Sequence, residues 1–228
     1  MTLTPSGDFL FCLRGSPILH VIKSATDEVK ETTFTVSPLQ PIGVHVTRDS
    51  RVIIGAVDTG SYLPATGPRQ VIVMDQSGYQ QKVFEYDKDK QPLFTAPARV
   101  TSNSYNIGVI DVLSKDGLGQ VIIIDYDGVV RNVFKGQADV NKHDSPLIPN
   151  DIVSTQSGNF VISDSRNHTM HVLSNEGEIV TYYNTLRMGI AIPFSVSLGH
   201  TGELYIGCGT SKVKGEKAKV FKIDNFVW

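Results

Sequence analysis

The sequence predicts an all-β protein, a β-propeller of four-stranded antiparallel blades, and two observations carry this prediction. The first is the stretch 150–183, in which three polar connectors separate four short apolar runs. Short runs rich in Val, Ile and Tyr, bounded by Gly, Asn, Asp and Ser, are typical of strands joined by tight turns. The second is that this unit recurs roughly every 45–55 residues, which is the period of propeller blades.

The units share an opening and a closing signal. A proline followed three residues later by a β-branched residue opens four of them, at Pro41, Pro97, Pro149 and Pro193. In three units a glycine closes the turn after the third strand, at Gly78, Gly128 and Gly177. With one further unit before Pro41, the 228 residues divide into five blades within a single predicted domain, at 1–40, 41–96, 97–148, 149–192 and 193–228. We expect the second strands to be the most buried, with Val109, Val161 and Tyr205 central.

One unit also resembles a known repeat. Residues 158–172 carry Asp-x-x-Asn-His, from Asp164 to His168, between their second and third strands, as NHL repeats do. The other units keep the strand rhythm without this signature. The chain is therefore similar to the divergent NHL-like propellers at the C-termini of tripartite-motif (TRIM-NHL-like) proteins. Since that family usually has six blades, the resemblance implies an incomplete six-bladed ring, with a true five-bladed ring as the alternative.

The same resemblance implies a function. It predicts a non-enzymatic recognition propeller, the partner- or substrate-binding end of a tripartite-motif-like ubiquitin ligase. Any ligase activity would belong to a RING region that this sequence lacks, and any oligomer to a missing coiled coil. A protein is the expected partner. RNA-binding NHL propellers present a basic face with aromatics, which this composition hardly supplies.

Composition bears on whether the protein binds nucleic acid, associates with a membrane or forms disulfides. A net charge of −2, with 19% charged and 8% aromatic residues, gives no electrostatic reason to expect nucleic acid or an anionic membrane. No apolar stretch approaches the roughly 18 residues that a membrane-spanning helix needs. Cys12 and Cys208 are expected to be buried, reduced thiols, with a disulfide between the end blades as the alternative. These features favour a cytoplasmic protein.

The longest connectors indicate where a partner would bind. Because the chain reverses at each strand, second-to-third loops and crossovers between blades lie on one face of a propeller. This set holds the long connectors, including 58–69, 87–96 and 135–148, whereas the other set is short. Long loops on a rigid scaffold often carry recognition, although neutral drift in surface loops is the alternative. The candidate binding residues are Tyr62, Arg69, Lys88, Lys90, Phe94, Lys142 and His143, with packing of Phe94 beneath its own loop as the alternative to an exposed position.

Chemical signatures are sparse, and no cofactor is expected. The six histidines lack metal-ligand spacing, and His168 is interpreted as a structural turn residue. Asp111 and Asp164 end second strands, where they are expected to cap the following turns. The enzymatic alternative is a calcium-dependent propeller hydrolase of the lactonase or paraoxonase kind, for which these two carboxylates are the candidate ligands.

Overall fold

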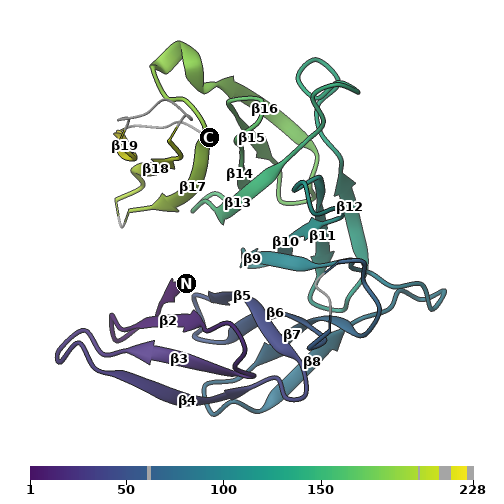
Figure 1. Cartoon of the computed structure of the whole chain (residues 1–228), viewed down its shortest axis with the longest axis vertical. Helices are drawn as coiled ribbons and strands as arrows, with labels where there is room; N and C mark the ends of the chain where they lie inside the picture. Colours follow the sequence, from purple (N-terminus) through teal and green to yellow (C-terminus); the bar gives the residue numbers. More distant parts are fainter. Residues whose placement is uncertain (61–62, 200, 211–216, 225–228) are drawn as a thin grey trace. The chain divides into compact units, whose positions relative to one another are not determined.

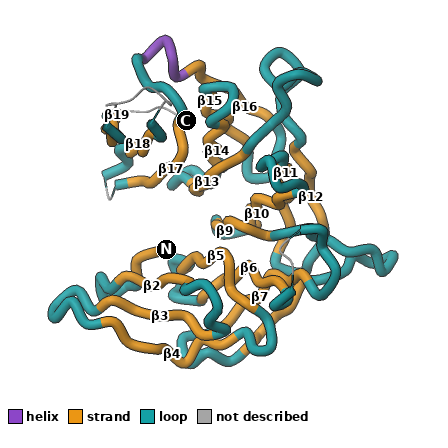
Figure 2. The backbone as a smooth tube through the Cα atoms, in the orientation of Figure 1, coloured by secondary structure: helices purple, strands orange, loops and turns teal. Residues whose placement is uncertain are grey.

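The computed structural model describes residues 1–60, 63–199, 201–210 and 217–224. Its regular structure is almost entirely β, and the prediction of an all-β fold is confirmed. Within these ranges the single helix is η1 (Thr185–Met188), a four-residue 3-10 turn (Figure 2). Accordingly, no helix in this part of the chain is long and apolar enough to cross a membrane.

Five antiparallel sheets follow one another along the chain, and each keeps its strands in sequence order (Figure 1). The first contains β1 (Thr2–Leu3), β2 (Phe9–Cys12), β3 (Ile18–Ile22) and β4 (Val29–Thr35). The second contains β5 (Gln40–Val46), β6 (Val52–Val57), β7 (Arg69–Met74) and β8 (Gln80–Phe84). The third contains β9 (Pro97–Ser102), β10 (Asn106–Val112), β11 (Gly119–Asp125) and β12 (Val130–Phe134).

The last two sheets differ in strand number. The fourth contains β13 (Pro149–Ser154), β14 (Phe160–Asp164), β15 (Thr169–Leu173) and β16 (Ile179–Asn184). The fifth contains β17 (Pro193–Leu198), β18 (Leu204–Cys208) and β19 (Lys219–Ile223). The residues that remain for a fourth strand, 225–228, lie outside the described part of the chain. The structure thus has five blades, and the expectation of a six-bladed ring finds no support.

The repeated prolines and glycines have clear physical roles. Pro41 lies in β5, and the other three opening prolines begin β9, β13 and β17. These strands are the first in their sheets, where a residue without an N–H costs no ladder hydrogen bond. Gly78, Gly128 and Gly177 have φ of 89°, 84° and 89°, in the left-handed region that favours glycine. Each donates its N–H to the carbonyl three residues earlier and so closes a hairpin.

The chain divides into two compact units, residues 1–101 with 111–114 and residues 102–110 with 115–228. In the first unit, β5 packs against β1, β2 and β3. The core between these sheets includes Leu10, Leu19, Ile54, Ile72 and Met74. Gly55 in β6 lies so close to β9 that a Cβ there would be 2.1 Å from the Pro97 carbonyl oxygen.

In the second unit, β17 packs against β13 and β14. Their shared core includes Val161, Met170, Val196, Leu204 and Ile206. On the other face of the fourth sheet, Phe160 and Ile152 approach Gly108 of β10, where an added Cβ would be 3.0 Å from each. Both faces of the fourth sheet are therefore covered within this unit.

Two burial expectations need correction. Val109 and Val161 are fully buried, whereas Tyr205 is half-buried. Side chains alternate along a strand, so Tyr205 faces away from the core that Leu204 and Ile206 enter. The two cysteines are free thiols as expected, but both are half-buried rather than buried. Partial burial raises the pKa of the Cys12 thiol to about 11.

Candidate functional site

The two large side chains predicted to form an exposed binding face in the first unit are buried. Phe94 is 4% exposed and Arg69 is 3% exposed, which favours the alternative for Phe94 and corrects the prediction that Arg69 is a surface contact. Asp111 accepts the N–H groups of Thr95 and Ala96, so the end of the loop is tied down and the phenyl ring turns inward, out of water. Arg69 Nη1 donates to Asp58 Oδ1 at 2.8 Å, which commits its charge within its own loop.

Four other predicted binding residues are exposed, two in each unit. Lys88 and Lys90 are exposed in a tight turn of the first unit, where Lys90 has a positive φ of 58°. Lys142 and His143 are exposed in the crossover 135–148 of the second unit. Tyr62 lies outside the described residues. Their role in binding a partner stays a prediction from the sequence.

The Asp111 carboxylate binds backbone N–H groups of the chain before β9 and does not face a solvent-accessible site. It is fully buried at the second strand's end, and its Oδ1 accepts the N–H groups of Thr95 at 2.7 Å and Ala96 at 2.6 Å. We expected it to cap the turn that follows β10. Its bonds to Thr95 and Ala96 fix the crossover that precedes β9, a contact that local sequence patterns do not reveal.

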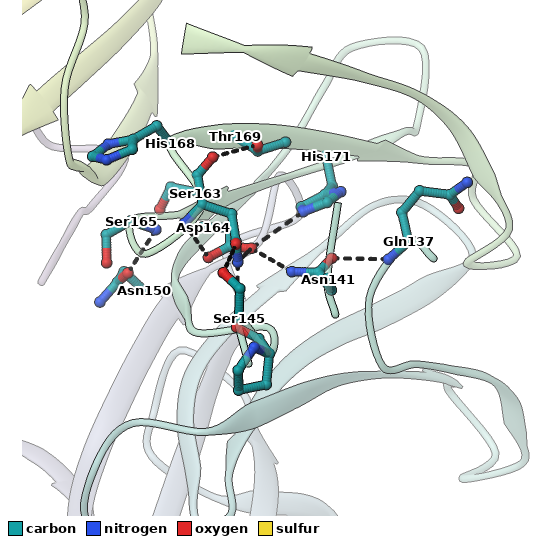
Figure 3. Close-up of polar contacts among 12 residues, drawn as sticks. Gln137, Asn141, Ser145, Asn150, Ser163, Asp164, Ser165, His168, Thr169 and His171 are labelled. Atoms are coloured by element: carbon teal, nitrogen blue, oxygen red, sulfur yellow. Dashed lines mark hydrogen bonds and ion pairs between the residues drawn. The ribbon is translucent and has the colours of Figure 1, made fainter. Parts of the chain in front are cut away.

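Asp164 is the centre of a larger polar network in the second unit (Figure 3). Its Oδ2 accepts Nδ2–H groups from Asn141 at 2.7 Å and from Asn167 at 2.8 Å. Its Oδ1 accepts the Asn167 backbone N–H at 3.3 Å. The carboxylate therefore caps the turn after β14, as predicted, and also anchors the crossover 135–148.

In the side-chain amides of Asn141 and Asn167, both the oxygen and the nitrogen have hydrogen-bond partners. Asn141 Oδ1 accepts the Gln137 N–H at 2.9 Å, and Asn167 Oδ1 accepts the Ser145 hydroxyl. His168 is a turn residue, as predicted: its Nδ1 accepts the Ile192 N–H at 2.9 Å, and its carbonyl accepts from Thr185. The Asp-x-x-Asn-His signature is thus fully used in holding one turn and the chain around it.

His171 is the residue that sequence reasoning missed. Its side chain is fully buried on β15, and its Nε2 lies 3.5 Å from Asp164 Oδ2, so the two are close without an aligned hydrogen bond. Neither ring nitrogen has a hydrogen-bond partner in the described part of the chain. Phe134 meets the imidazole edge-on, with ring centroids 5.3 Å apart. A buried polar group without a partner is costly, so its retention calls for an explanation.

Opposing influences set the protonation of Asp164. Burial raises the pKa of this carboxyl, but the His171 imidazole and the Asn167 and Asn141 amides lower it. The pKa lies below its ordinary value as a result. Asp164 is accordingly an anion at neutral pH, as its two amide donors require.

A polar pocket of about 430 Å³ lies beside this network. Its lining residues are Asp139, Val140, Asn167, Thr169, Tyr182, Asn184 and Arg187. Thr169 pairs with Asn184, and His171 pairs with Tyr182, so these four side chains share one face of the fourth sheet. Asp139 and Val140 come from the crossover that Asp164 anchors. The pocket is therefore formed between a sheet face and the loop fixed to it.

The enzymatic alternative invoked calcium, and the two candidate carboxylates do not fit that ion. Calcium takes six to eight oxygen ligands, usually from several carboxylates and carbonyls. Asp111 and Asp164 instead accept N–H groups, and the amide oxygens next to Asp164 are occupied. Among the residues that the structure describes, no three His, Cys, Asp or Glu side chains come together as metal ligands would.

No protein-family model and no curated protein sequence matches the chain. Solved structures do resemble it. A protein of unknown function from Bacteroides caccae has a TM-score of 0.66 at 16% identity, covering 98% of this chain and 76% of that one. A gluconolactonase from Xanthomonas campestris has a TM-score of 0.62 at 12% identity, covering 91% and 67%. A luciferin-regenerating enzyme has a TM-score of 0.61 at 13% identity, covering 96% and 74%.

The fold is a β-propeller. A gluconolactonase and a luciferin-regenerating enzyme are among the similar structures, and this finding overturns the expectation of a non-enzymatic, tripartite-motif-like recognition propeller. Similarity to NHL repeats and a link to ubiquitination are likewise unsupported. The motif misled the prediction for a physical reason: Asp164 and Asn167 are hydrogen-bonded to each other and stabilise the turn after β14. Such a turn is a feature of the backbone and carries no function of its own.

Proposed function

We propose that this chain is a propeller enzyme of the lactonase kind, which hydrolyses a small cyclic ester. The observation that supports this most is the similarity to a gluconolactonase over 91% of the chain. In such a reaction the oxygen of water adds to the ester carbonyl and the ring C–O bond breaks. The product is an open-chain hydroxy acid.

The pocket beside Asp164 is the proposed substrate site. Arg187 is the cation and Asp139 the carboxylate among its lining residues. In this proposal the guanidinium stabilises the negative charge that develops on the carbonyl oxygen, and the carboxylate accepts a proton from the attacking water. Asp164 does not touch the substrate. It positions the crossover that carries Asp139, through Asn141.

The test is hydrolysis of gluconolactone, followed as acid release at constant pH against the spontaneous rate. We expect the wild-type protein to accelerate acid release, and Arg187→Gln and Asp139→Asn to lose at least about a hundredfold, the low end of general acid–base contributions. Arg48→Gln and Asp89→Asn are matched controls at exposed positions of the first unit and should keep the wild-type rate. No acceleration by folded wild-type protein, or equal rates in all four variants, would reject the proposal.

A further inference from the structure

The pocket beside Asp164 presents four polar groups that the rest of the described chain does not use. They are the Arg187 guanidinium, the Asp139 carboxylate, the Tyr182 hydroxyl and the Asn184 Nδ2, none of which has a hydrogen-bond or ion-pair partner among the residues described. Some other surface charges in this protein are paired, as Arg131 is with Asp125 and Lys23 with Asp8. The pocket thus has a cation and a carboxylate on its lining that are both available to a ligand.

These groups stand on fixed backbone. Asn184 Oδ1 caps η1 by accepting the Leu186 N–H at 3.0 Å, and Gly189 closes the same turn. Thr185 is buried and donates both its N–H and its hydroxyl to the His168 carbonyl. Arg187 thus projects from a turn whose two ends are both held. Such a support limits the entropy that a ligand must remove on binding.

The opposite wall is fixed as well. Asp139 lies two residues before Asn141, whose side chain is bound to Asp164 and to the Gln137 N–H. Val140 donates its N–H to the Gln137 carbonyl at 2.9 Å, which makes this part of the crossover a tight turn. The pocket therefore exists before a ligand arrives, as small-molecule sites usually do.

We propose that this pocket binds a small hydroxylated carboxylate, of the aldonate kind that sugar-lactone hydrolysis releases. This proposal deepens the proposed function and rests on it for the choice of ligand. Arg187 offers the planar fork that pairs with a carboxylate through two parallel hydrogen bonds. Asp139 accepts hydrogen bonds from hydroxyl groups, and Asn184 Nδ2 donates to them. The Tyr182 ring lies against the carbon chain.

Two other ligand classes fit less well. An apolar molecule would find Val140 as the sole aliphatic residue among the lining side chains. A phosphate group carries close to two negative charges at neutral pH, and Asp139 would repel it more than a singly charged carboxylate. The volume of about 430 Å³ lies within the range of roughly 300–1,000 Å³ seen for small-molecule pockets, which suits a six-carbon acid.

Sodium gluconate is the probe for a calorimetric titration of the whole chain. Glucose, which lacks the carboxylate, and hexanoate, which lacks the hydroxyls, are the comparison ligands. We expect gluconate to bind at least about tenfold more tightly than either, since each loses one set of charge-assisted or neutral hydrogen bonds. Arg187→Gln should weaken gluconate binding by a similar factor and leave glucose binding unchanged. Arg48→Gln is the matched control and should bind gluconate as wild type does.

The result separates this inference from the proposed function. Gluconate binding that Arg187→Gln weakens, without lactone hydrolysis, would support the ligand class and reject the enzyme. Lactone hydrolysis that excess gluconate does not inhibit would support the enzyme and overturn the ligand class. Equal binding of gluconate, glucose and hexanoate, or equal gluconate binding in wild type and Arg187→Gln, would also overturn it. Thermal unfolding of each variant verifies that it is folded.

Discussion

At the scale of single residues, Asp164 shows how one carboxylate fixes a site without lining it. Its oxygens hold the turn after β14 through Asn167 and the crossover through Asn141. Both partners are neutral amides, so the negative charge is stabilised by hydrogen bonds while His171 stays nearby without an aligned bond. Asn167 lines the pocket, and Asn141 lies next to the lining residues Asp139 and Val140. A substitution at Asp164 is therefore expected to alter the pocket walls.

We predict that Asp164→Asn destabilises the fold by roughly 2–4 kcal/mol at neutral pH. A hydrogen bond to a charged group contributes about 1.5–3 kcal/mol, and the new amide cannot accept from every donor that the carboxylate serves. Urea unfolding of wild type and variant measures the difference. Asp89→Asn, at an exposed position, is the control and should change stability by less than about 0.5 kcal/mol.

The same comparison has a definite pH dependence. Since the pKa of Asp164 is lower in the folded protein, its carboxylate stabilises the fold above the unfolded pKa of about 3.9, and this contribution is lost as pH falls through the folded pKa. The stability gap between wild type and Asp164→Asn should therefore be largest near neutral pH and narrow below about pH 4. A gap that widens on acidification would show that the carboxylate is not the stabilising form.

At the scale of elements, glycine decides how closely strands approach one another. In the first unit Gly55 of β6 faces the Pro97 carbonyl at the start of β9, and the backbone of β9 leaves no room for a side chain. Gly43 of the neighbouring strand β5 is crowded by β9 as well, because a Cβ there would be 2.9 Å from the Ala98 carbonyl oxygen. Glycine is used here for space, whereas in the hairpin turns it is used for a positive φ.

We predict that Gly55→Ala costs more than about 3 kcal/mol of stability, the upper end of typical overpacking, because a backbone atom must move. Gly7→Ala is the informative comparison: Gly7 has a φ of 81° but nothing within 4 Å of an added Cβ. It should cost only the left-handed backbone term of about 1–2 kcal/mol. Denaturant unfolding measures both variants, and a Gly55→Ala protein as stable as Gly7→Ala would contradict the close packing of β6 and β9.

At the scale of the whole molecule, the propeller fold supports enzymes without requiring the same site in each. The chain matches a gluconolactonase and a luciferin-regenerating enzyme in fold at 12% and 13% identity. At that distance the residues at a shared place are free to differ, and function depends on the site rather than the scaffold. The candidate carboxylates here illustrate this, since Asp111 and Asp164 are committed to hydrogen bonds.

We predict that neither Asp111 nor Asp164 holds calcium. Calorimetric titration with calcium should reveal no site tighter than about millimolar that depends on either residue, which is the weak end of protein calcium affinities. Asp111→Asn and Asp164→Asn should then leave the calcium isotherm of the folded protein unchanged. A micromolar site abolished by one of these substitutions would mean that the loops around it rearrange to expose the carboxylate.

The sequence by itself determined the strands, the turns and the five-blade repeat. These depend on neighbours in the chain: the alternation of side chains along a strand, the φ that glycine permits and the N–H that proline lacks. The turn role of Asp164 was also visible, because its partner Asn167 lies three residues away in the sequence. The partners of His168, Thr185 and Ile192, lie 17 and 24 residues away. The same local motif was misleading about function, since it describes a turn rather than a family.

Only the tertiary structure decided burial and the composition of the site. Phe94 and Arg69 were predicted as binding residues because they belong to long connectors, yet both are buried, and Asp111 and Asp58 hold the chain around them. The pocket joins Asp139 to residues 167–187, and strand pairing places the buried His171 opposite Tyr182 of its lining. Such contacts span tens of residues. The stability of these long-range contacts depends on which surfaces pack together in the folded protein, and a local sequence pattern does not specify that packing.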